Sequence, residues 1–283
     1  MSNPKRTLSE MQQRVINANT LKHDVVNAKE MLRLEMLSSF KAYTKAMFKA
    51  QYKRNFIVAE HHEKIIEALQ DVVDGKCRRL IINIAPRYGK TELVIKSFIS
   101  WCFALNPKCR FLHLSYSDVL VADNSDTVRS IMQESLYKEL FPQSKLEKEK
   151  ASNKRWRTAA GGEMYAVSTQ GQVTGFGAGN VDEEEPIKGS ETADNLTFDE
   201  DMNGMLEQIG AKANVFQGAI MIDDPIKPED ADSDIVRERI NLRFENTIRN
   251  RTNSRNTPII IIMQRLLEHD LCGYLQEVVP DEW

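Results

Sequence analysis

A cluster of phosphate-binding residue types lies in residues 83–94, NIAPRYGKTELV. The Gly-Lys-Thr triplet ends a known loop pattern, G-x-x-x-x-G-K-[ST], but Ile84 stands where that pattern has its first glycine. In such a loop Gly89 lets the backbone approach phosphate, Lys90 reaches the β- and γ-phosphates, and the Thr91 hydroxyl ligates Mg²⁺. A helix that merely begins with Gly-Lys-Thr is the alternative, so a second motif is needed.

Residues 219–225, AIMIDDP, supply that second motif. An apolar strand here ends in Asp223 and Asp224, and two carboxylates at the end of a buried strand are costly without a cation or hydrogen-bond donors. In P-loop NTPases one such carboxylate holds Mg²⁺ and an adjacent one orients and deprotonates the attacking water. Acids before a proline are common alone, but the two motifs together predict an ATPase.

Polar residues also follow the apolar run in residues 258–271, PIIIIMQRLLEHDL. Ligands of open α/β sheets lie at the carboxyl ends of strands. Gln264 could therefore sense the γ-phosphate and Arg265 could reach a phosphate or a carboxylate, with an ordinary strand end as the alternative. Arg87 adds a second cation beside the Gly-Lys-Thr loop.

The elements that must position these residues alternate between strand and helix. This alternation predicts a mainly parallel sheet with right-handed crossovers. Strands are expected at residues 79–84, 110–114, 218–224 and 257–264, and helices at 61–74, 90–105, 118–140, 234–250 and 268–279. The Gly- and Thr-rich residues 155–179 favour hairpin-like strands and loops at the edge of the sheet.

Two flanking segments are strongly charged. Residues 7–53 contain no proline or glycine and predict one or two helices, and residues 1–54 carry eleven Lys/Arg against four Asp/Glu. Lys41, Lys45, Lys49 and Lys53 share one helical face. This face is either a solvated surface or an arm that contacts phosphates or a partner. Residues 179–201 carry nine Asp/Glu against one Lys and predict a mobile acidic excursion, not a calcium site.

The bulk composition excludes several classes. A net charge of −3 gives no whole-protein signal for nucleic acid, although local basic patches can bind it. The four cysteines form no C-x-x-C pair, which disfavours a zinc site and favours reduced thiols. The sequence has no signal-peptide core at its start and no apolar run of about 18 residues, so no membrane association is expected.

Four motifs in order resemble a known family, the terminase large subunits of tailed phages and prophages. APRYGKTELV is similar to their variant phosphate loop, [AP]-P-R-x-G-K-[ST]-E, and TQGQVTGFGAG to the Gly-rich segment that precedes their second acidic motif. GAIMIDDPIKPEDADS resembles that acidic motif, and IIIIMQRLLEHDLCGYL resembles the following coupling segment. The resemblance covers about residues 56–280.

The resemblance implies a fold, an activity and partners. The fold would be a three-layer α/β P-loop NTPase of the RecA-like, additional-strand type (residues 55–283), with an acidic excursion at about 179–214 and a helical N-terminal segment (1–54). The activity would be ATP-driven packaging of double-stranded viral DNA into a procapsid in the host cytoplasm. The partners would be the portal protein, the small terminase subunit and further copies of the chain in a ring, usually of five.

The resemblance also implies roles for individual residues. ATP and Mg²⁺ would be bound, with Arg87, Lys90, Gln264 and Asp224 in catalytic roles and Thr91 and Asp223 on the metal. Asp224 stands where many members have Glu, one methylene longer. The residues around the nucleotide would be Pro86, Arg87, Tyr88, Gly89, Lys90, Thr91 and Glu92.

Complete members of the family carry a nuclease domain after the ATPase, and this chain ends at Trp283 without the acids for a two-metal site. We therefore expect no DNA cleavage by this chain. Two other functions compete with the packaging motor. One is a helicase-like or remodelling P-loop ATPase, and the other is an inactive prophage remnant that binds nucleotide without hydrolysing it.

Overall fold

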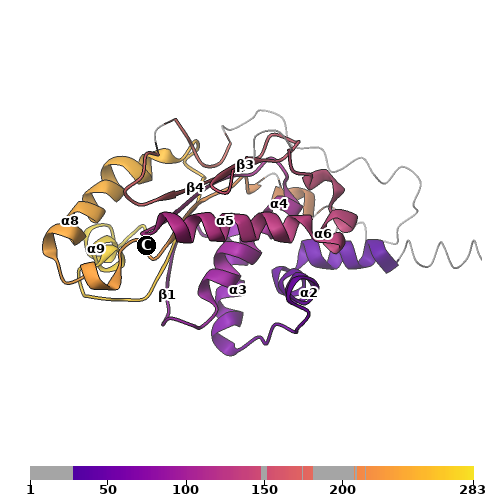
Figure 1. Ribbon diagram of the computed structural model, residues 1–283, viewed down its shortest axis with the longest axis horizontal. Coiled ribbons are helices and arrows are strands. Elements are labelled where there is room, and N and C mark those ends of the chain that lie inside the picture. The colour runs from indigo at the N-terminus through magenta and orange to yellow at the C-terminus, as the bar shows by residue number, and fades with distance from the viewer. Residues whose placement is uncertain (1–27, 148–151, 174, 181–206, 208, 214) are drawn as a thin grey trace, which may run out of the picture.

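A six-stranded sheet forms the centre of the computed structural model, which describes residues 28–147, 152–173, 175–180, 207, 209–213 and 215–283 (Figure 1). The strand order is β1-β6-β5-β2-β4-β3. The strands are β1 (Arg79–Asn83), β2 (Arg110–Ser115), β3 (Arg155–Arg157), β4 (Glu163–Ser168), β5 (Ile220–Asp223) and β6 (Ile259–Met263).

Five of the strands run parallel, and β3 pairs antiparallel with β4 at one edge. β6 lies between β1, which leads into the Gly-Lys-Thr loop, and β5, which ends at Asp223. This inserted strand is the topological mark of the additional-strand, RecA-like arrangement. The predicted fold class is therefore confirmed, as is the hairpin at the sheet edge.

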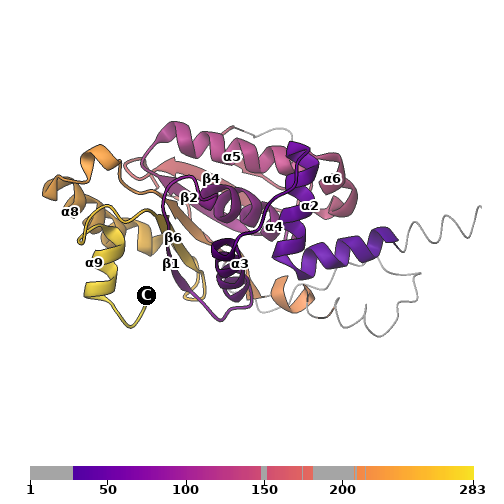
Figure 2. The same ribbon diagram turned by 90° about the horizontal axis from the view of Figure 1, so that it is seen from below.

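The sheet is buried on both faces because its strands alternate side chains between two cores. In β6, Ile260 and Ile262 belong to one core cluster, whereas Ile259 and Ile261 belong to the other. A parallel sheet covered on both sides requires such continuous apolar strands. Figures 1 and 2 show the resulting three layers, with α3, α4 and α5 on one side and α8 and α9 on the other.

Helices of the first layer follow the sequence pattern with two departures. They are α3 (Glu60–Val73), the π-helical turn η1 (Glu92–Ser97), α4 (Phe98–Leu105), α5 (Asp118–Gln133), α6 (Ser135–Leu140) and the short η2 (Pro142–Ser144). The helix expected over 118–140 is broken at Glu134, whose backbone is extended (φ −57°, ψ 145°). The helix expected to open at 90 continues through a π turn, a feature that is frequent at functional sites.

The second layer covers the opposite face with shorter elements. They are η3 (Pro228–Asp230), α8 (Asp234–Arg243), the π turn η4 (Phe244–Ile248), η5 (Arg249–Arg251) and α9 (Leu271–Val278). Ser233 caps α8 by accepting from the Val236 N–H. This layer packs against the sheet through Phe244, Leu271 and Leu275.

Helical structure precedes the sheet in residues 28–38 and in α2 (Phe40–Tyr52). Phe40, Tyr43 and Met47 are buried in the first core, so α2 packs on the same layer as α4 and η1.

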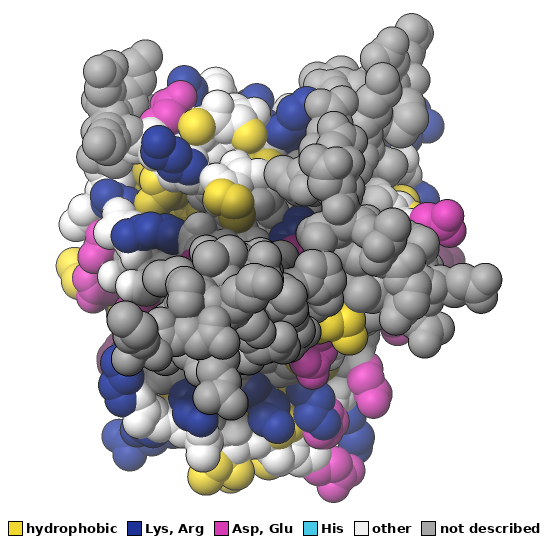
Figure 3. All heavy atoms as spheres, turned by 90° about the vertical axis from the view of Figure 1, so that its right-hand side faces the viewer, with side chains coloured by type: hydrophobic (Ala, Val, Ile, Leu, Met, Phe, Trp, Pro, Cys, Tyr) yellow, Lys and Arg dark blue, Asp and Glu magenta, His cyan; other side chains and the backbone are white. Residues whose placement is uncertain are grey.

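On the face shown in Figure 3, Lys and Arg side chains are interspersed with Asp and Glu. The division of the chain at residue 54 stays a prediction.

Two predicted segments fall largely outside the described residues: the first half of the N-terminal segment, 1–27, and most of the acidic excursion, 181–206. Among the residues that the structure describes, none of the helices is long and apolar enough to cross a membrane.

Candidate nucleotide site at the carboxyl ends of three strands

Three neighbouring strands, β1, β6 and β5, end side by side at one edge of the sheet. The register pairs Asn83 with Met263 and Asp223 with Ile262. The segments that follow these strands are the Gly-Lys-Thr loop, Gln264 and Asp224, so the topology gathers them at one edge. Ligands of open parallel sheets bind at this edge.

The loop after β1 turns sharply before the helix starts. Arg87 and Gly89 both have left-handed backbones, with φ of 68° and 73°. The Gly89 carbonyl accepts the Leu93 N–H at 3.0 Å, so the helix begins directly after this glycine. A helix that starts in this way presents backbone N–H groups and the positive end of its dipole to an anion.

Four side chains from the loop and β5 contact one another. The Thr91 hydroxyl donates to Asp223 Oδ2 at 2.8 Å. The Lys90 ammonium is buried, forms an ion pair with the Asp224 carboxylate, and lies 3.6 Å from Asp223 Oδ1. The two motifs that the sequence places about 130 residues apart therefore form one site.

The neighbours of the buried Asp223 carboxylate compensate its negative charge only in part. Burial raises its pKa to about 6, and the neighbouring Asp224 adds to the rise, while Lys90 and Thr91 oppose it. Its Oδ1 is buried and accepts no hydrogen bond from the described residues. A buried carboxylate oxygen that lacks a hydrogen bond and lies beside a threonine hydroxyl suits a hard cation.

The backbone of Asp224 is held in an unusual conformation. Its φ of 45° lies in the left-handed region, which costs a non-glycine residue about 1–2 kcal/mol. Its N–H donates to the Ile262 carbonyl at 2.8 Å, and its own carbonyl accepts the Tyr116 N–H at 2.9 Å. Backbone bonds to both neighbouring strands thus aim this carboxylate at Lys90.

His62, which the sequence interpretation did not single out, braces the loop. Its Nδ1 accepts the Ala59 N–H at 3.1 Å, so Nε2 carries the proton and donates to the Tyr88 carbonyl at 3.0 Å. Burial lowers the pKa of His62, which favours this neutral form. The HH pair at the start of α3 was the available signal, but its role depends on how α3 packs against the loop.

Glu92, predicted near the nucleotide, faces helix α2. Its carboxylate accepts from the Tyr52 hydroxyl at 3.3 Å and pairs with Lys96 at 3.0 Å. Burial raises the pKa of Tyr52. These contacts tie the helix that follows the loop to the N-terminal helical segment.

The remaining predicted residues lie at the rim. Pro86 and Arg87 form the exposed turn, and the Arg87 side chain makes no ion pair or hydrogen bond with the described residues. Tyr88 is exposed, with its ring edge-on to His61 at 5.3 Å. Gln264 is half-buried directly after β6. The Arg265 guanidinium is held by Asp270 at 3.1 Å and by two loop carbonyls.

The donor set fits Mg²⁺ better than a metal with an all-protein ligand cage. Among the described residues no group of three or more His, Cys, Asp or Glu could hold a metal ion. Mg²⁺ typically takes one or two carboxylates, and substrate phosphates and water complete its shell. Asp223 and Thr91 supply the protein part of such a shell.

No protein-family model and no curated protein matches the chain. Among solved structures it is similar to the crystal structure of the large terminase of bacteriophage HK97, at 13% identity and a TM-score of 0.49. The alignment covers 84% of this chain and 41% of that one, so the chain spans less than half of its length. At this level the likeness does not assign an activity.

Proposed function

We propose that the protein hydrolyses ATP at this site. The strongest support is that four side chains meet at neighbouring strand ends beside a helix N-terminus. They are Lys90, Thr91, Asp223 and Asp224. A chance Gly-Lys-Thr helix start has no reason to face two carboxylates on a neighbouring buried strand. Their proximity supports a role in phosphoryl transfer.

In this proposal the loop residues bind and orient the triphosphate. Backbone N–H groups after Gly89 and the Lys90 ammonium bind the β- and γ-phosphates. Arg87, whose side chain is free of the described residues, adds positive charge from the exposed turn. Gln264 lies at the end of β6, between the loop and Asp224, where it could position the water that attacks the γ-phosphate.

Mg²⁺, when bound, would neutralise charge that develops on the phosphates. Thr91 and Asp223 are the residues that would hold it, and their mutual hydrogen bond would be exchanged for metal contacts. The raised pKa of Asp223 supports this assignment, because burial leaves the carboxylate with negative charge that a cation would compensate.

Asp224 is proposed as the general base. Its carboxylate forms an ion pair with the Lys90 ammonium. In this proposal the Lys90 ammonium also contacts the phosphates of bound ATP, and the Asp224 carboxylate accepts the proton of the attacking water.

We further propose the biological role that the four motifs imply: a motor of the terminase large subunit type, which moves double-stranded DNA of a tailed phage or prophage into a procapsid. The site geometry supports the ATPase, and the order of the motifs supports the packaging role. The partners would be the portal, the small terminase subunit and further copies of the chain in a ring, in the host cytoplasm.

Steady-state release of phosphate from MgATP, with and without linear duplex DNA and purified portal and procapsids, tests the proposal. We expect slow turnover by the chain alone, stimulation by the assembly, and DNA that becomes resistant to added nuclease. Strand separation by the chain with no nuclease-resistant DNA would favour a helicase-like enzyme. Absence of turnover in every assembly would refute the ATPase.

A further inference from the structure

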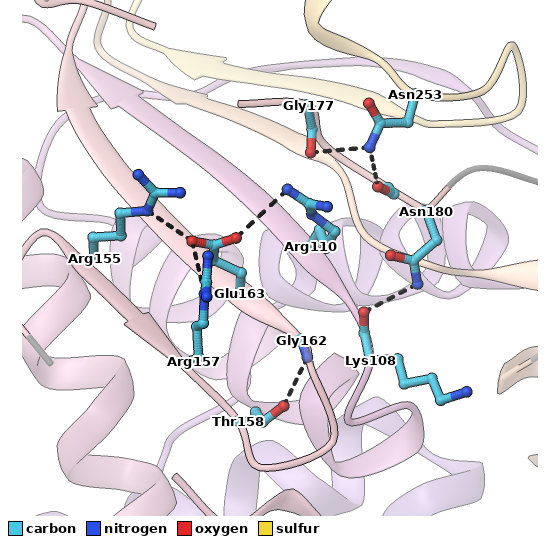
Figure 4. A network of polar contacts seen from close by, with 11 residues as sticks. Lys108, Arg110, Arg155, Arg157, Thr158, Gly162, Glu163, Gly177, Asn180 and Asn253 are labelled. Atoms are coloured by element: carbon cyan, nitrogen blue, oxygen red, sulfur yellow. Dashed lines mark hydrogen bonds and ion pairs between the residues drawn. The ribbon is translucent and has the colours of Figure 1, made fainter. Parts of the chain in front are cut away.

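A second charged cluster lies at the opposite edge of the sheet, where β2 and β4 begin (Figure 4). The register places Arg110 of β2 and Arg157 of β3 on either side of Glu163 of β4. Arg155 lies two residues before Arg157 and therefore on the same face of the strand. Three guanidinium groups surround one carboxylate.

The positive charge of this cluster exceeds what its carboxylate needs. Glu163 is 4% exposed and meets Arg155 Nε at 2.7 Å, Arg157 Nε at 3.2 Å and Arg110 Nη2 at 3.5 Å. A buried carboxylate needs one guanidinium for neutralisation, so the second and third leave a net charge of +2. Lys108 adds an exposed cation at the same edge (Figure 4).

Several donors of the cluster are not used by the protein. Arg155 and Arg157 contact Glu163 through Nε, and their terminal Nη groups form no hydrogen bond with the described residues. In Figure 4 the terminal nitrogens of Arg155 extend away from the Glu163 carboxylate. Arg110 Nε is buried without a hydrogen-bond partner among the described residues. The Arg155 and Arg157 side chains are 47% and 40% exposed, so a ligand can reach them.

Aromatic rings fix the directions of two of these arginines. The Arg110 guanidinium lies 5.0 Å from the centre of the Phe176 ring, and that of Arg155 lies 5.3 Å from the centre of the Tyr165 ring. Together with Glu163, these contacts restrict the arginine rotamers before any ligand binds. Pre-organised guanidinium groups lose less entropy on binding phosphate than free surface lysines do.

We propose that this arginine cluster binds the phosphodiester backbone of duplex nucleic acid. Guanidinium groups match phosphate oxygens in pairs, and Arg155 and Arg157 are spaced along the strand by roughly 6.6 Å, as for a line of phosphates. The site is distinct from the triphosphate site, because the length of β2 separates the two by roughly 17 Å. This inference rests on the proposed packaging function only in naming duplex nucleic acid as the ligand.

The test is binding of a fluorescein-labelled 30-base-pair duplex, without nucleotide, across a series of salt concentrations. Arg155→Ala combined with Arg157→Ala should weaken binding on the order of 10- to 100-fold at 0.1 M salt. The slope of log K against log salt should fall by about 1.8, from about 0.9 per lost phosphate contact. The charge-matched control is Lys64→Ala combined with Lys76→Ala, two exposed residues on the opposite side of the sheet. This control should change neither the affinity for the duplex nor the slope. Equal losses in both double variants, or none, would overturn the proposal.

Further variants separate a role in binding from a role in folding. Arg157→Gln alone keeps the shorter Arg155–Glu163 pair and should reduce the slope by about one. The Arg155→Lys, Arg157→Lys pair should retain the slope, because each position keeps its charge. Thermal unfolding identifies any variant that weakens binding only by unfolding; if Arg157→Gln is folded and its slope is unchanged, the proposal fails.

Two more readouts identify the ligand and separate this inference from the ATPase. If 10 mM inorganic phosphate raises the unfolding temperature of the wild type but not of the double alanine variant, while both bind duplex equally, the site serves free phosphate and the proposal fails. Lys90→Ala should bind duplex like the wild type. Salt-sensitive duplex binding through Arg155 and Arg157 in a protein that hydrolyses no ATP would keep this inference and refute the proposed ATPase.

Discussion

Replacement of Asp223 by Asn should stabilise the protein in Mg²⁺-free buffer at neutral pH while removing a ligand of the proposed metal. The Asp223 carboxyl is buried, its Oδ1 lacks a hydrogen bond from the described residues, and a second carboxylate follows it in the chain. Asn has nearly the same shape, can still accept the Thr91 hydroxyl through its amide oxygen, and carries no charge. The substitution therefore removes the electrostatic cost and keeps the packing.

The size of the effect follows from the pKa. Burial raises the pKa of Asp223 from 3.8 to about 6. Between these values the folded protein holds a proton that the unfolded chain has released, so wild-type stability falls as pH rises through this window. At about 1.4 kcal/mol per pH unit the loss is about 3 kcal/mol above pH 6 and vanishes below about pH 4. With roughly 2 cal/mol/K of unfolding entropy per residue, this corresponds to roughly 5 °C in Tm for a chain of this length.

Urea unfolding with EDTA at pH 4.5 and pH 7.5 measures this difference. The stability advantage of Asp223→Asn should be about 1 kcal/mol at pH 4.5 and about 3 kcal/mol at pH 7.5. The matched control is Asp118→Asn, because Asp118 is exposed and its pairing with Lys154 lowers its pKa; that variant should show no gain at pH 7.5. If Asp223→Asn were less stable than the wild type at pH 7.5, the buried Asp223 charge would not destabilise the metal-free protein, and the reasoning would be refuted.

Three further substitutions test the loop. Lys90→Ala should weaken MgATP binding on the order of 10- to 100-fold by calorimetry, because charge-assisted bonds to phosphate contribute about 1.5–3 kcal/mol, and unchanged circular dichroism would show an intact fold. Gly89→Ala should lower stability by about 1–2 kcal/mol in urea titrations, because its φ is 73° and the new Cβ would lie 3.1 Å from His62 Nε2. His62→Phe should weaken ATP binding roughly fivefold by loss of the hydrogen bond to the Tyr88 carbonyl, and an unchanged Kd would show that the brace is dispensable.

The sequence predicted the central residues because parallel topology fixes where strand ends meet. Asp223 ends one buried apolar strand, and the loop that carries Lys90 follows another, so the two motifs lie at the same edge of the sheet. The Lys90–Asp224 ion pair was not predicted, since it depends on the left-handed backbone at Asp224. The residue types around Asp224 do not predict that this non-glycine residue has a positive φ.

Other features were beyond the sequence for equally physical reasons. The break at Glu134 carries no glycine or proline, and the apolar spacing continues from α5 into α6 across it. The π turn at Glu92–Ser97 shifts the helix register by an amount that composition does not encode. The clustering of Arg110 with Arg155 and Arg157 needs three strands in register, because Arg110 lies about 45 residues before the other two in the sequence.

The central claim is most directly tested by a single-turnover experiment with radiolabelled ATP, in which wild type and Asp224→Asn are each in excess over the nucleotide. We expect Mg²⁺-dependent conversion of bound ATP to ADP by the wild type. Asp224→Asn should still bind ATP but convert it about 10²–10⁴-fold more slowly, because a general base is lost. Equal conversion by the two proteins, or loss of ATP binding in Asp224→Asn with undiminished conversion of what remains bound, would contradict the central claim.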